Sequence, residues 1–117
     1  MGHARLQGER TLMRIHIGEN DKGQGKVLYK AIVEVLHDEK FSGATVIRAV
    51  AGSGPTGHYH GGHVFAHRHD LPVVIEVVED SDRIDRILPK LDDMVGRGVI
   101  TLEKVSVILY RPEQKSA

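Results

Sequence analysis

The chain has no cysteine and no tryptophan among its 117 residues. Without cysteine there are no disulfides, thiolate zinc sites, iron–sulfur clusters or cysteine nucleophiles. The same absence fits a reducing cytoplasm, which is the localisation that we expect. Aromatic residues make up only 4% of the chain, so the stacking platforms that bind single-stranded nucleic acid are not expected either.

An excess of one charge and long apolar runs are also missing. Lys and Arg number 16, as do Asp and Glu, so the formal net charge is zero. A neutral domain lacks the positive field on which non-specific nucleic-acid binding rests. No apolar run approaches the roughly 18 residues that span a bilayer, and the start of the chain has no stretch typical of a signal peptide. We therefore expect no nucleic-acid partner and no insertion into a membrane.

What is present suits one small globular domain. Apolar residues make up 40% of the chain and charged residues 27%, a composition typical of a packed core. Residues 1–10 are polar and predict a disordered tail, residues 11–111 predict the domain, and residues 112–117 predict a second tail.

The hydrophobic periodicity alternates between the strand and helix types. Period-two or β-branched patterns predict four strands, and apolar stripes at helical spacing predict two helices. A polar turn over Gly18–Gly25 separates the first strand from the first helix. The strands are expected at Thr11–Ile17, Thr45–Val50, Pro72–Val78 and Val99–Tyr110, and the helices at Lys26–Lys40 and between Asp80 and Gly96.

This β-α-β-β-α-β order predicts the α+β class and the ferredoxin-like fold, with two helices on one face of a four-stranded antiparallel sheet. The run Pro72–Val78 has no polar alternation, so the other sheet face also needs cover. A homo-oligomer that packs sheet faces together would provide it.

Two glycine-rich segments are candidate anion sites. Gly52, Gly54 and Thr56 lie directly after a predicted strand, where backbone N–H groups can approach a phosphate closely. No helix follows at once, so this is neither a P-loop nor a dinucleotide fingerprint. In the second segment, Gly96 and Gly98 flank Arg97 and present a guanidinium to an anion. The alternatives are a flexible loop entry for the first segment and a helix C-cap with a turn for the second.

Histidine is unusually frequent, with eight copies, five of them between His58 and His69. His58 and His60 lie on the same side of an extended segment and are candidate ligands for zinc, nickel or copper. The alternative is a solvated loop tip that titrates near neutral pH. No G-x-S-x-G elbow and no base–nucleophile pair is visible, so we do not expect an enzyme.

The segment Gly43–Gly54, the long loop after it and the strand end Ile75–Val78 resemble the PII signal-transduction proteins. Residues 11–110 resemble more closely their PII-like relatives, domain-of-unknown-function family 190. This resemblance rests on Ile15–Lys22, His58-x-His60 and Asp70–Pro72.

The resemblance implies a homotrimer with an adenine nucleotide in each cleft between subunits. Residues 52–70 would be the T-loop, which docks onto a partner such as a membrane transporter or channel. By position, Thr45 and Val78 would line the adenine. Gly52, Gly54 and Thr56 would form the base of the T-loop, and Gly96, Arg97 and Gly98 would face the phosphates.

The chain departs from the PII pattern at the phosphate end of this site. Val99 stands where PII proteins have a lysine, and Thr56 stands where they have a glutamine. We therefore expect AMP or ADP in preference to ATP. The alternative function is that of a divalent-metal-binding protein which uses His58 and His60.

Overall fold

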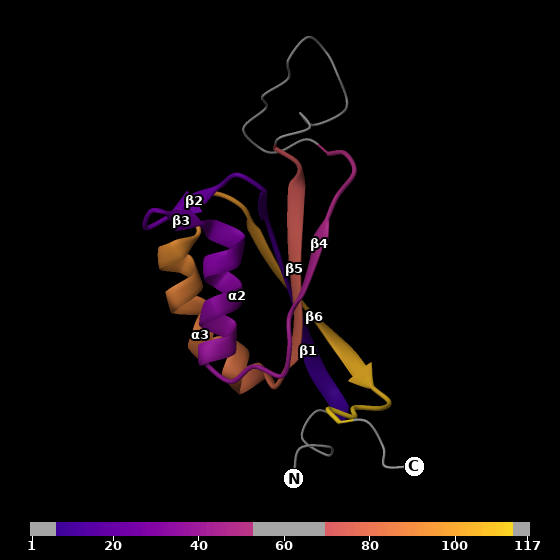
Figure 1. Cartoon of the computed structure of the whole chain (residues 1–117). Helices are drawn as coiled ribbons and strands as arrows, with labels where there is room; N and C mark the ends of the chain where they lie inside the picture. The colour runs from indigo at the N-terminus through magenta and orange to yellow at the C-terminus, as the bar shows by residue number, and fades with distance from the viewer. Residues whose placement is uncertain (1–6, 53–69, 114–117) are drawn as a thin grey trace.

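The computed structural model describes residues 7–52 and 70–113. Its main elements follow the predicted order of strands and helices (Figure 1). They are β1 (Gly8–Gly18), α2 (Leu28–Asp38), β4 (Thr45–Arg48), β5 (Pro72–Glu79), α3 (Ser81–Met94) and β6 (Val99–Val107).

The four long strands form one antiparallel sheet in the order β4-β5-β1-β6. Ile15 of β1 lies opposite Ile75 of β5 and Ile100 of β6, which fixes the register at the centre of the sheet. Both helices cover one face of the sheet and leave the other face open (Figure 1). This is the predicted ferredoxin-like fold.

The core lies between the helices and the covered sheet face. Leu28, Ile32 and Leu36 form the buried stripe of α2, at spacings of four residues that place them on one side of the helix. Alternate residues of β1 and β5 face them, among them Met13 and Ile75, which are fully buried. No helix in the described part of the chain is long and apolar enough to cross a membrane.

Several boundaries differ from those predicted. β1 begins at Gly8, so the tail expected over residues 1–10 is wrong for Gly8–Arg10, which pair with Val105–Val107. β4 ends at Arg48 and β6 at Val107, each short of its predicted end. The polar turn expected over Gly18–Gly25 contains the first strand of a small hairpin, formed by β2 (Lys22–Gly23) and β3 (Lys26–Val27).

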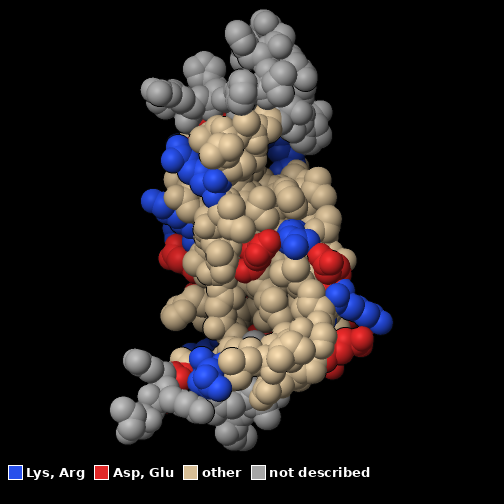
Figure 2. Space-filling model, turned by 90° about the vertical axis from the view of Figure 1, so that its right-hand side faces the viewer, with Lys and Arg blue, Asp and Glu red and all other residues tan. Residues whose placement is uncertain are grey.

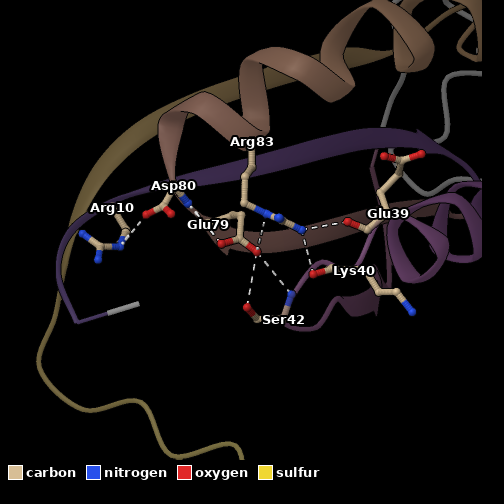
Figure 3. A network of polar contacts seen from close by, with 7 residues as sticks. All are labelled: Arg10, Glu39, Lys40, Ser42, Glu79, Asp80 and Arg83. Atoms are coloured by element: carbon tan, nitrogen blue, oxygen red, sulfur yellow. Dashed lines mark hydrogen bonds and ion pairs between the residues drawn. The ribbon is translucent and has the colours of Figure 1, made fainter. Parts of the chain in front are cut away.

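A buried carboxylate joins the helices to the sheet (Figure 3), at the end opposite the stems of the long loop (Figure 1). The side chain of Glu79 is fully buried, and it accepts hydrogen bonds from the Ser42 N–H and hydroxyl, both at 3.3 Å. Arg83 Nε lies 3.5 Å from Glu79 Oε2. Arg83 also donates to the carbonyls of Glu39 and Lys40, both at 2.7 Å, and so caps the end of α2. The network holds the end of α2 against the start of α3.

Candidate functional site

The candidate site lies at the end of the sheet from which the long loop leaves, which we call the loop end (Figure 1). β1 and β4 finish there, and β5 and β6 begin there. Antiparallel pairing therefore brings four connecting segments together, although they are far apart in sequence. They are residues 18–21, 49–52, 70–71 and 95–98.

The turn of residues 18–21 is the fixed part of the loop end. The Gly18 N–H donates to Asp21 Oδ2 at 2.8 Å, and the Asp21 N–H donates to the Gly18 carbonyl at 3.2 Å. The Asp21 carbonyl accepts from the N–H of Leu28, the first residue of α2, at 2.8 Å. Asp21 therefore joins the end of β1 to the start of α2, and only 15% of its side chain is exposed.

The segment of residues 95–98 presents Arg97 to the 18–21 turn. Arg97 Nη2 lies 3.6 Å from Asp21 Oδ1, and 55% of the Arg97 side chain is exposed. The distance makes this an ion pair without a short hydrogen bond. Arg97 is thus held beside a carboxylate while more than half of its side chain is exposed, and its guanidinium is a candidate to bind an anion.

Gly98 brings the turn of residues 96–98 directly onto the end of β1. Its φ is +149°, and a Cβ at this position would lie 2.5 Å from the carbonyl oxygen of His16. The fold itself therefore requires glycine here. α3 ends at Met94, the next residue Val95 is extended, and Gly96 has open space around it. A left-handed glycine cap at Gly96, the alternative reading of this motif, is not what the structure has.

Both stems of the long loop are tied to the same region. The Glu19 N–H donates to the Leu71 carbonyl at 2.8 Å, and Glu19 Oε2 pairs with Arg48 Nε at 2.9 Å. A Cβ on Gly52 would lie 2.8 Å from Pro72 Cγ, so the two stems approach closely where the loop begins and ends. Contacts thus run from both stems to the 18–21 turn, and from there to Arg97.

Charged side chains of both signs lie at the loop end. Glu19 and Asp21 pair with Arg48 and Arg97. Asp70 Oδ1 lies 3.2 Å from the position of a Cβ on Gly18, which places a third carboxylate beside Asp21. An anion that binds here meets guanidiniums that already have carboxylate partners.

The predicted site residues fall into three groups. Gly52, Gly96, Arg97 and Gly98 gather at the loop end. Thr45 and Val78 lie away from it on the open sheet face, where Thr45 is opposite Glu76 and Val78 follows two residues later on the same face. The structure does not bring this pair to the glycine turn within one chain. Gly54, Thr56, His58 and His60 lie outside the described residues.

Sequence reasoning assigned no role to Asp21, Glu19 or Arg48, which connect the site. The spacing Gly18-x-x-Asp21 was the available signal, because an Asp side chain often accepts a hydrogen bond from a nearby backbone N–H in a turn. In residues 7–52 and 70–113 no group of three or more His, Cys, Asp or Glu side chains is arranged to hold a metal ion. The metal prediction for His58 and His60 stays a prediction.

The open face of the sheet carries a short row of charged side chains among residues other than Lys, Arg, Asp and Glu (Figure 2). Arg14 Nε lies 2.9 Å from Glu76 Oε2, and its Nη1 lies 2.5 Å from Glu103 Oε1. The hydrogen bond to Glu76 and then that to Glu103 raise the pKa of Arg14 above its ordinary value. Arg14 therefore stays charged at every working pH. Ile47 and Val99, on the two edge strands of this face, are 44% and 48% exposed.

A family model, DUF190, described as an uncharacterized ACR, matches residues 10–107. The chain belongs to the DUF190 family. A UPF0166 protein of Aquifex aeolicus (strain VF5) is 37% identical to this DUF190 chain over 100 residues, which cover 86% of the chain and 94% of the relative. A UPF0166 protein of Methanocaldococcus jannaschii is 37% identical over 92 residues, which cover 78% of the chain and 84% of the relative. The predicted membership of family 190 is confirmed.

A solved structure resembles the DUF190 chain along most of its length. This is CPII from Thiomonas intermedia K12, bound to ADP, AMP and acetate. The TM-score is 0.52 at 16% sequence identity, and the match covers 90% of the DUF190 chain and 92% of CPII. At this identity the likeness shows that the two chains share the PII-like fold.

Proposed function

We propose that this DUF190 protein is a regulatory protein that binds an adenine nucleotide between the subunits of a homotrimer. In this proposal it acts in the cytoplasm as a binding protein and not as an enzyme. The ligand biases residues 52–70, which contact a partner such as a membrane transporter or channel. The observation that carries the proposal is the convergence of Arg97 and both loop stems on the 18–21 turn.

The loop end supports the phosphate part of the proposal. Arg97 has a half-exposed side chain and is adjacent to the glycine that packs on β1. AMP and ADP are proposed over ATP because Val99 supplies no cation after Gly98, and because carboxylates already pair with the nearby guanidiniums. The nucleotides bound to CPII, a protein of the same fold, fit this ligand class.

The open sheet face supports the trimer. In one chain Ile47 and Val99 leave apolar surface in water, which is unfavourable for a stable monomer. Thr45 and Val78 lie on this same face. A neighbouring subunit seated on the face would add walls to the site at these residues, and the proposed adenine pocket is incomplete without it.

Calorimetry on the full chain with AMP, ADP, ATP and cyclic AMP tests the proposal. We expect AMP or ADP to bind, and Arg97→Ala to weaken AMP binding about tenfold or more, the value of a lost charged hydrogen bond. Arg86→Ala, which removes an exposed arginine of α3, is the control and should leave the affinity unchanged. Absence of binding by all four nucleotides at millimolar concentration would reject the nucleotide function.

A further inference from the structure

The carboxylate of Asp21 has two oxygens with different surroundings. Oδ2 accepts the hydrogen bond from the Gly18 N–H at 2.8 Å, which fixes the side chain to the end of β1. Oδ1 faces Arg97 Nη2 at 3.6 Å. Because Asp21 is mostly buried and anchored while Arg97 is more than half exposed, Arg97 is the partner with room to turn toward a ligand.

A phosphate bound by Arg97 would therefore lie close to a fixed negative charge. The guanidinium and the carboxylate together carry no net charge, so Arg97 attracts the first phosphate mainly by its short contact. Each further negative charge on the ligand gains little from this neutral pair, because the repulsion of Asp21 offsets the attraction of Arg97. The second carboxylate near Gly18, that of Asp70, adds repulsion of the same sign.

From this geometry we propose that Asp21 is a specificity-determining residue. Its carboxylate holds Arg97 in the ligand-free protein and selects against ligands with more negative charge. The inference rests on the proposed nucleotide site and adds to it the feature that ranks ligands by their number of phosphates. Asp21 acts through its charge and through Arg97, and it need not touch the ligand.

Asp21→Asn removes the negative charge of residue 21 and keeps the hydrogen bond that holds the turn. Asparagine has nearly the same shape and keeps a side-chain oxygen that accepts from the Gly18 N–H, so the turn of residues 18–21 is retained. At about 6 Å and physiological salt, removing one carboxylate improves binding by about 1.7-fold for each negative charge on the ligand. The expected gain is thus about threefold for AMP and about fivefold for ADP, with none for adenosine.

The experiment is calorimetry of the full chain with adenosine, AMP and ADP at fixed salt. Wild type, Asp21→Asn and the control Asp38→Asn are compared. Asp38 is an exposed carboxylate at the far end of α2 from the 18–21 turn, so its removal should change no affinity. Thermal melting checks that each variant is folded. A second variant, Asp21→Ser, also offers an oxygen to the Gly18 N–H, and we expect it to gain affinity for AMP and ADP as Asp21→Asn does.

The outcomes separate the two claims. Gains that rise from adenosine to AMP to ADP in the Asp21 variant alone support the inference. Equal shifts for all three ligands would show a structural effect, and unchanged or weaker AMP and ADP binding would show that Asp21 does not oppose ligand charge. Either result overturns the inference while the nucleotide function stands. If no chain binds AMP or ADP, the proposed function fails and the inference with it.

Discussion

Replacement of Gly98 by alanine tests the close contact that places the 96–98 turn on the sheet. The added Cβ would lie 2.5 Å from the His16 carbonyl oxygen, and the φ of +149° is one that residues with a side chain rarely adopt. The backbone must move at the point where Val99 pairs with His16. Backbone strain of about 1–3 kcal/mol and one weakened strand hydrogen bond of about 1 kcal/mol predict a total loss of about 2–4 kcal/mol.

Two other glycines separate strain from steric overlap. Gly25 has a φ of +77° but open space around it, so Gly25→Ala should cost about 1 kcal/mol through backbone strain alone. Gly96 has open space and no positive φ, so Gly96→Ala should change the stability by no more than about 0.5–1 kcal/mol, in either direction.

Urea denaturation followed by circular dichroism, at one protein concentration, measures the three free energies of unfolding. The expected order of stability is Gly96→Ala above Gly25→Ala above Gly98→Ala. If Gly98→Ala were as stable as Gly96→Ala, the 96–98 turn would not rest on the end of β1, and the placement of Arg97 beside Asp21 would lose its basis.

Two further predictions concern the other end and the open face of the sheet. Glu79→Ala should lower the free energy of unfolding by about 3 kcal/mol in the same urea assay, because it leaves the Arg83 guanidinium without its buried carboxylate partner. The exposed Glu9→Ala should cost less than about 0.5 kcal/mol, and equal losses would contradict the buried network. Ile47→Asp should convert the proposed trimer to monomers in light scattering without unfolding the chain, whereas Lys30→Asp, on the exposed side of α2, should leave the trimer intact. A trimer that survives Ile47→Asp would place the subunit contact elsewhere.

The architecture was predictable because its signals are local and repeated. The alternation of Met13, Ile15 and Ile17 and the stripe of Leu28, Ile32 and Leu36 each determine an element and its buried side. Elements held by distant partners were not predictable. Gly8–Arg10 are polar and indicate a tail, yet they pair with Val105–Val107. The two-residue strands β2 and β3 are too short to have a hydrophobic period.

The sequence named the glycines and Arg97 of the candidate site, but it did not predict the contacts between its segments. Gly52 and Gly98 signal close approach of the backbone, but the approaching groups, Pro72 and the His16 carbonyl, come from other strands. The pairing of Asp21 with Arg97 depends on where the 96–98 turn crosses the end of β1, which no local pattern encodes. The glycine motifs thus stay a prediction of the site, whereas the fold determines which charges meet at the loop end.

The polar contacts at the two ends of the sheet differ in burial, and this difference determines which end a bound ligand could affect. At one end Glu79 and Arg83 hold both helices in a buried network. At the loop end the arginines of the ion pairs are half exposed, and a competing anion can reach Arg97 without breaking the core. The 18–21 turn contacts Arg97 through Asp21 and the loop stem at Leu71 through Glu19. A phosphate that draws Arg97 away from Asp21 would therefore act on the 18–21 turn, which also anchors the stems of the long loop. In the proposed function, the ligand and the loop are thus connected through this one turn.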